Sequence, residues 1–249
     1  FYGTGLMLYD RLAGKAGLGD TQFLDRAATL NAMPGVRSRG LVGSVQYWDG
    51  QFDDARFAVA LARTAANHGA LVLNYCPVRS LLHGKGKISG ACVADAETGE
   101  QIDIHARCVV NATGVWVDAL RRMDADPESH IVTPSQGVHL VVDRKFLPGG
   151  HALLVPKTAD GRVMFAVPWL GKLLLGPTDT PRDEIESEPM PLADEVDFIL
   201  GEAGRYLAHK PSAGDVRSIW GGVRPLVTPP GGRAGNTKDM SREHLIVVD

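Results

Sequence analysis

Two side chains suited to acid–base and anion chemistry stand beside glycines in this sequence. His139 follows Gly137 and Val138, and Arg224 lies between a glycine-containing segment and Pro225. An imidazole titrates near neutral pH and can accept a proton from an alcohol. A planar guanidinium can hold two oxygens of an anion at once. The alternatives are a histidine hydrogen-bonded within the core and a surface arginine at a strand end.

A short apolar segment, 109–114, forms a second candidate for ligand contact because it ends in Ala112, Thr113 and Gly114. Its β-branched residues predict a strand. Gly114 has no Cβ and tolerates a positive φ, so the backbone there can approach a bound ligand closely. The segment therefore resembles the ligand edge of a nucleotide-binding sheet, although no glycine-rich phosphate loop precedes it. A strand followed by an ordinary turn fits the local sequence equally well.

The charge balance favours a small-molecule ligand over a nucleic acid. The 249 residues carry 26 basic and 29 acidic side chains, a formal net charge of -3, without a long run of one sign. A chain of this length can bury a substantial core. Its charge pattern does not attract nucleic acid electrostatically. We therefore expect a globular protein with a small-molecule substrate and no nucleic-acid partner.

The cysteines and histidines predict neither a metal site nor a disulfide framework. Cys76, Cys92 and Cys108 lack CxxC spacing and the density of a secreted scaffold. The histidines also lack metal-ligand spacing. We expect no metal and a reducing, cytoplasmic setting. No apolar run approaches the roughly 20 residues that cross a bilayer, so any membrane contact would be peripheral.

The first half of the chain predicts a layered arrangement of helices and strands. Helical spacing covers 5–13 and 20–30, with Asp20 or Thr21 as the cap of the second helix, and a strand follows within 40–49. A helix over 53–68 should bury one apolar face and end at Gly69. The predicted strands then cover 70–75, 78–82, 88–94, 101–105 and 109–114, the middle three as a meander.

The second half predicts an antiparallel sheet followed by a helix. Short strands separated by glycine-rich turns cover 138–142, 152–156, 163–168 and 172–176. A helix is expected over 191–209, a last strand over 216–224, and a surface loop over 228–237.

Seven short segments, taken in order, resemble one family across almost the whole chain. The resemblance is to FAD-dependent glycerol-3-phosphate dehydrogenase, within the D-amino-acid-oxidase-like flavoprotein group. The segments are 47–49 (Tyr-Trp-Asp), 52–57 (Phe-Asp-Asp-Ala-Arg-Phe), 110–116 (Val-Asn-Ala-Thr-Gly-Val-Trp), 135–139 (Ser-Gln-Gly-Val-His), 165–169 (Phe-Ala-Val-Pro-Trp), 176–180 (Gly-Pro-Thr-Asp-Thr) and 221–226 (Gly-Gly-Val-Arg-Pro-Leu), followed by Ser241 and Arg242.

The resemblance implies a mixed α/β (α+β) fold in which a partial, Rossmann-like FAD-binding domain is interleaved with an antiparallel-sheet substrate domain. Residues 1–51 would contribute a helical segment and a strand to the substrate side, and 52–128 the second half of the FAD-binding domain. Residues 129–216 would form the substrate domain, and 217–249 would return toward the FAD-binding domain. The family's pyrophosphate-binding glycine loop would precede residue 1, and its last part would follow residue 249.

The activity implied is oxidation of glycerol 3-phosphate to dihydroxyacetone phosphate by hydride transfer to FAD, with the electrons passed to a membrane quinone. The enzyme would be cytoplasmic and peripheral on the inner membrane face. Two alternatives stay open: an oxidase that hands the electrons to oxygen, and a cofactor-free fragment without turnover. We expect this piece of chain alone to hold FAD poorly.

The resemblance also assigns roles to single residues. Arg224 would bind the substrate, and Arg242 would neutralise its phosphate unless it is a solvated loop arginine. His139 would face the substrate as the general base. Thr178 and Asp179 would lie near the boundary of substrate and flavin, where Asp179 is alternatively a turn cap. The cofactor contacts would come from Val78, whose backbone meets the adenine, and from Ala112, Thr113 and Gly114 on the flavin side.

Overall fold

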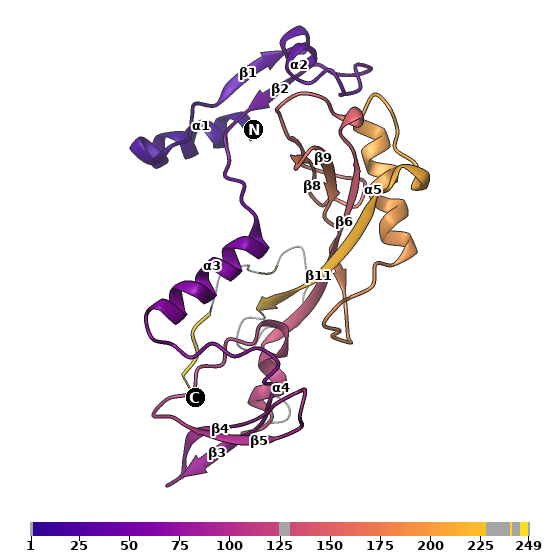
Figure 1. Cartoon of the computed structure of the whole chain (residues 1–249). Coiled ribbons are helices and arrows are strands. Elements are labelled where there is room, and N and C mark those ends of the chain that lie inside the picture. Colours follow the sequence, from indigo (N-terminus) through magenta and orange to yellow (C-terminus); the bar gives the residue numbers. More distant parts are fainter. Residues whose placement is uncertain (1, 125–129, 228–239, 241–244, 249) are drawn as a thin grey trace. The chain divides into compact units, whose positions relative to one another are not determined.

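The computed structural model describes residues 2–124, 130–227, 240 and 245–248, as helices and antiparallel sheets (Figure 1). The mixed helix-and-sheet class expected from the sequence is confirmed. The chain divides into two compact units, one made of 1–48 with 130–249 and the other of 49–129.

The N-terminal segment of the first unit combines helices with a small hairpin-like sheet. It contains α1 (Tyr2–Ala13), a 3-10 turn (Gly14–Ala16), β1 (Gln22–Asp25), α2 (Arg26–Ala32) and β2 (Gly43–Gln46). The helix expected over 20–30 is therefore wrong in its first part, because residues 22–25 pair with β2 as a strand. The helix cap is Asp25, whose side chain accepts a hydrogen bond from the backbone nitrogen of Ala28 at 2.7 Å.

The main sheet of this unit is antiparallel throughout, as predicted. Its order is β10-β6-β9-β8-β7, and β11 pairs with β6 from Val132 to Val141, along the edge of β6 that β9 and β10 leave open. The strands are β6 (Val132–Asp143), β7 (Leu153–Val155), β8 (Met164–Trp169), β9 (Lys172–Gly176), β10 (Thr180–Pro181) and β11 (Ser218–Val227), with 3-10 turns at Arg144–Phe146 and Ala213–Asp215.

Helix α5 (Ala193–Tyr206) supplies the other side of the core. Val138, Leu140 and Val142 alternate along β6, and all three are fully buried. Ile199 and Ala203, one turn apart on α5, are fully buried in the same cluster. Burying each large aliphatic side chain stabilises the fold by about 1.5–3 kcal/mol. Alternation on the strand and helical spacing on α5 thus leave the opposite face of β6 available for polar residues.

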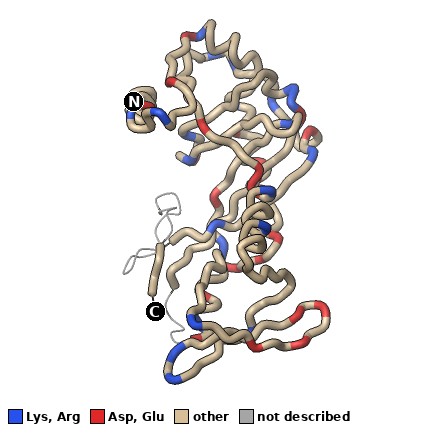
Figure 2. Tube along the Cα trace, turned by 60° about the vertical axis from the view of Figure 1, so that its left-hand side comes forward, with Lys and Arg blue, Asp and Glu red and all other residues tan. Residues whose placement is uncertain are grey.

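The second unit contains a helix and the predicted three-stranded meander. Its elements are α3 (Asp54–Asn67), β3 (Val78–Gly84), β4 (Lys87–Ala94), β5 (Gln101–His105), a 3-10 turn (Gly114–Trp116) and α4 (Val117–Arg121). The strands pair in the order β3-β4-β5. Asp53 caps α3, and Gly69 follows it with φ +87°. Both units carry acidic and basic residues (Figure 2).

Two strands predicted in this unit are not formed. Residues 70–75 and 109–114 lie outside every strand of the described chain, and Leu71 and Val110 are 82% and 81% exposed. A strand of a parallel sheet needs a hydrogen-bonded neighbour and cover on both faces, and the described residues offer neither segment a neighbouring strand. The buried face predicted for α3 is also wrong, because Phe57 and Leu61 are more than half exposed. Among the described residues, no strand of the predicted parallel sheet covers this face.

Candidate functional site

Strands β6 and β11 carry the chemistry-bearing residues on one face of the main sheet. Directly opposed residues of an antiparallel pair project to the same side, and alternate residues share a face. The register pairs His139 with Trp220, Gly137 with Gly222, and Ser135 with Arg224. On the face opposite the core, the two glycines therefore lie side by side, with His139 and Trp220 at one end of them and Arg224 at the other.

The guanidinium of Arg224 lies across Gly137. A Cβ at Gly137 would stand 2.0 Å from Nη2 and 2.5 Å from Cζ of Arg224, so only glycine leaves room for that side chain. Nη1 of Arg224 donates a hydrogen bond to the backbone oxygen of Thr178 at 3.1 Å. The sequence singled out Arg224 but not Gly137, whose part becomes visible only from the strand register.

His139 stacks on Trp220, the residue directly opposite it. The ring centroids are 5.3 Å apart and the planes are inclined by 15°. Gly176 lies close to Cδ2 of the imidazole, because a Cβ on Gly176 would be 2.9 Å from that atom. Burial lowers the pKa of His139 below its ordinary value, and the positive charge of Arg224 lowers it further. The imidazole is thus held in its neutral form, which can accept a proton.

Trp220 belongs to the candidate site through its contact with His139, although its sequence context did not single it out. It directly precedes the Gly221-Gly222 pair, and nothing in its local sequence distinguishes it from a packing aromatic. Only the pairing of β11 with β6 puts its ring on the imidazole.

Thr178 and Asp179 follow β9 and lie against β6, in the same unit as His139 and Arg224. The hydroxyl of Thr178 accepts a hydrogen bond from the backbone nitrogen of Val138 at 2.9 Å. The carboxylate of Asp179 accepts a hydrogen bond from the hydroxyl of Ser135, and its backbone oxygen accepts one from the guanidinium of Arg162. Both residues are buried. Their contacts anchor the turn to the sheet.

The predicted cofactor residues lie in the second unit. Val78 begins β3 opposite Val93, and Ala112 to Gly114 lead into the 3-10 turn before α4. Gly114 adopts φ +60°, and nothing lies within 4 Å of the position of a Cβ. Asn111 organises this bend, because its amide donates to the backbone oxygen of Val117 at 2.9 Å.

This bend fits a flat cofactor at the level of its backbone. Residues 112–114 are exposed, and the left-handed glycine leaves the main chain open to close approach. The substrate candidates thus lie in one unit, with His139 and Arg224 on its main sheet and Thr178 and Asp179 in the turn after β9, and the cofactor candidates lie in the other unit. Arg242 lies outside the described residues.

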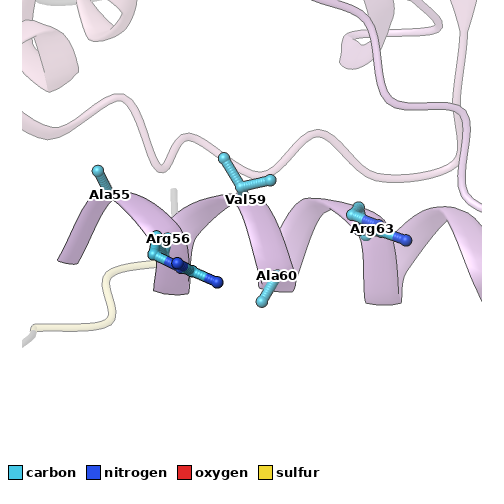
Figure 3. A pocket seen from close by; sticks show the side chains of 5 residues that line it. All are labelled: Ala55, Arg56, Val59, Ala60 and Arg63. Atoms are coloured by element: carbon cyan, nitrogen blue, oxygen red, sulfur yellow. The ribbon is translucent and has the colours of Figure 1, made fainter. Parts of the chain in front are cut away.

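A surface hollow of about 360 Å³ runs along α3, lined by Ala55, Arg56, Val59, Ala60 and Arg63 (Figure 3). None of the predicted site residues lines it, so it contributes nothing to the chemistry above. Within the described ranges we find no cluster of three or more metal-ligating side chains. The helices of the same ranges include none that is long and apolar enough to cross a membrane.

Comparison with known sequences supplies a family context for these residues. A family model with the description FAD dependent oxidoreductase (DAO) matches residues 4–248. The chain is 41% identical over 256 aligned residues to the mitochondrial glycerol-3-phosphate dehydrogenase of Bos taurus. It is 40% identical over 253 residues to a probable mitochondrial glycerol-3-phosphate dehydrogenase of Caenorhabditis elegans. Each alignment includes the whole chain but only 35% and 34% of the relative, so the chain spans about a third of their length.

Solved structures give the same context. The glycerol-3-phosphate dehydrogenase from Bacillus halodurans complexed with FAD matches 82% of this chain and 42% of its own, with a TM-score of 0.76 and 37% identity. The L-alpha-glycerophosphate oxidase from Mycoplasma pneumoniae with FAD bound matches 93% of this chain and 59% of its own, with a TM-score of 0.69. At 19% identity, the second likeness is one of fold.

Proposed function

Because this chain belongs to the family of FAD-dependent oxidoreductases, we propose that its protein oxidises glycerol 3-phosphate to dihydroxyacetone phosphate. The identity to dehydrogenases of that name supports the choice of substrate. The observation that carries the proposal is the shared face of β6 and β11, where a neutral imidazole and a guanidinium flank a pair of glycines. A dianionic phosphate needs a cation, and an alcohol needs a proton acceptor.

In this proposal His139 accepts the proton of the substrate's C2 hydroxyl, and Arg224 binds substrate oxygens in bidentate fashion. The low pKa of His139 suits the first role because only the neutral ring accepts a proton. Thr178 holds Arg224 through its backbone oxygen. Arg242, outside the described residues, supplies a second positive charge to the phosphate. FAD, when bound, accepts the hydride from C2.

For the cofactor we propose that the backbone at Val78 contacts the adenine and that Ala112, Thr113 and Gly114 approach the flavin. The open backbone at Gly114 supports this assignment. In this proposal residues 52–128 form the cofactor side, 1–51 contribute to the substrate side built by 129–216, and 217–249 lead back toward the cofactor side.

We further propose that a quinone takes the electrons, with oxygen as the alternative acceptor. A quinone is confined to lipid, so the protein would work in the cytoplasm in peripheral contact with the inner membrane face. Oxygen-dependent formation of hydrogen peroxide, without reduction of a quinone analogue, would replace this part of the proposal with an oxidase.

The test uses the full-length protein, purified with FAD, and follows reduction of a quinone analogue by glycerol 3-phosphate. We expect Arg224→Ala to lower kcat/KM by about 100-fold, since a hydrogen bond to a charged group is worth about 1.5–3 kcal/mol. Arg217→Ala is the control, because Arg217 pairs with Asp143 on the surface. An unchanged kcat/KM in Arg224→Ala would remove Arg224 from the site.

A separate preparation, residues 1–249 without the rest of the protein, addresses the cofactor-free alternative. Residues 1–249 purified alone should be colourless, because residues 70–75 and 109–114 lack strand partners in the described chain. A stoichiometric flavin absorbance from residues 1–249 would contradict that expectation.

A further inference from the structure

A buried carboxylate that the proposed chemistry does not use lies beside the turn of Thr178. Glu195 belongs to the first turn of α5 and is 4% exposed. An ionised carboxylate away from water is unfavourable unless hydrogen bonds and charges compensate it. A group of this kind therefore needs an explanation in terms of its partners.

Four donors surround Glu195. Oε1 accepts from the hydroxyls of Thr178 at 2.9 Å and Thr180 at 2.6 Å. Oε2 accepts from Nε2 of Gln136 at 2.7 Å and from the backbone nitrogen of Leu192 at 2.9 Å. Burial raises the pKa of Glu195, but the hydrogen bonds outweigh burial and leave the pKa below its ordinary value. The carboxylate is therefore held in its charged form.

The charge of Glu195 fixes the direction of the hydroxyl of Thr178. Because that hydroxyl donates to Glu195, its lone pairs are free to accept from the backbone nitrogen of Val138. The turn is thereby attached to β6 at the residue next to His139. The backbone oxygen of the same threonine accepts from Arg224. A continuous hydrogen-bonded path thus joins Glu195 to the guanidinium.

We propose that Glu195 is a positioning residue for the substrate arginine, acting through Thr178, an inference that rests on the proposed function of Arg224. A glutamine in its place offers one oxygen and one amide nitrogen, and the nitrogen would face either the two threonine hydroxyls or the two other donors. The turn would then lose its fixed hydroxyl direction, and Arg224 would lose the fixed position of its acceptor.

The test compares Glu195→Gln with Glu202→Gln in the full-length protein. Glu202 lies in the same helix, is also 4% exposed, and pairs with Arg205 at 3.0 Å instead of contacting the turn. We expect Glu195→Gln to raise KM for glycerol 3-phosphate at least 10-fold, and Glu202→Gln to leave KM within twofold even where both lower the unfolding temperature. Thr178→Val should add less than twofold to the KM of Glu195→Gln, because both act on one path.

A second readout separates this inference from the proposed function. Displacing the guanidinium of Arg224 raises the pKa of His139, whereas removing the negative charge of Glu195 alone would lower it. We therefore expect the NMR titration of His139 to move to higher pH in Glu195→Gln and not in Glu202→Gln. A His139 pKa that is unchanged or lower, or a KM increase shared equally by both variants, overturns the inference. If the wild-type protein does not oxidise glycerol 3-phosphate, the proposed function fails, and the titration alone decides the role of Glu195.

Discussion

Replacing Gly137 by alanine should damage the site while leaving the fold intact. The new methyl would occupy the position of the Arg224 guanidinium, 2.0 Å from Nη2. The displaced atoms are the far end of a flexible side chain, and Gly137 is not among the glycines with positive φ. The backbone therefore accommodates alanine. The reduced freedom of the unfolded chain favours the variant by about 0.4–1 kcal/mol.

The size of the functional effect follows from the displacement. The guanidinium must move from 2.0 Å to at least the 3.4 Å of an ordinary van der Waals contact, a retreat of about 1.4 Å. A misplacement of about 1 Å in a catalytic arrangement costs about 100-fold in rate. The hydrogen bond from Arg224 to the backbone oxygen of Thr178 gives a similar figure. A hydrogen bond to a charged group is worth about 1.5–3 kcal/mol, and its loss corresponds to a decrease of about 10- to 150-fold in kcat/KM. We expect kcat/KM for glycerol 3-phosphate to fall about 100-fold.

The assay pairs steady-state kinetics of the full-length protein with its denaturant unfolding. Gly222→Ala is the matched control for the position of Arg224, because it adds a methyl to the opposed glycine where nothing lies within 4 Å. The pKa of His139 should rise in Gly137→Ala, where Arg224 is displaced, and stay unchanged in Gly222→Ala. Wild-type kcat/KM in Gly137→Ala would refute it. Equal losses in both variants, with an unchanged His139 pKa, would mean that the glycines matter for another reason.

Two further predictions concern charge. Arg224→Met should raise the pKa of His139, but not to its ordinary value, because burial is the larger cause of its lowering. Since the pKa of His139 is lower in the folded than in the unfolded protein, the wild-type protein loses stability as the pH falls from the ordinary histidine pKa to the folded pKa. Arg224→Met should narrow this pH range. NMR titration checks the pKa of His139, and urea unfolding between pH 4 and 8 checks the loss of stability. Asp143 has its pKa lowered to about 2 by hydrogen bonds from Arg217 and Lys172. Its contribution to stability is complete above the ordinary carboxyl pKa and is lost as the pH falls through about 2, so urea unfolding should show wild type and Asp143→Asn converging at acid pH; a constant difference would contradict the assignment.

The antiparallel part of the fold could be predicted because its signals are local. Short strands separated by glycine turns, and the apolar spacing of α5, each determine an element without distant partners. The segments 70–75 and 109–114 are also short and rich in apolar residues, but a strand needs a neighbour as well, which a local pattern cannot guarantee. The burial of α3 depends on a neighbour in the same way. Its apolar spacing predicts a buried face, but only a covering sheet can bury it.

The residues of the candidate site also differ in whether their sequence signal is local. Arg224 and His139 could be proposed from sequence because their chemistry and motif context are visible there, and their roles stay predictions. Gly137, Trp220 and Glu195 could not, because each acts on a residue that is distant in sequence or on the opposite strand. A cross-strand register is a property of pairing, and no single segment contains it.

The stack of His139 on Trp220 gives the protein an optical reporter of its own chemistry. An imidazolium ring in contact with an indole quenches its fluorescence more strongly than a neutral imidazole does, and these two rings lie 5.3 Å apart. The chain has four tryptophans, so the signal of this one can be isolated by difference against Trp220→Phe. The protonation of His139 can therefore be followed by emission of light from the protein itself, without a label.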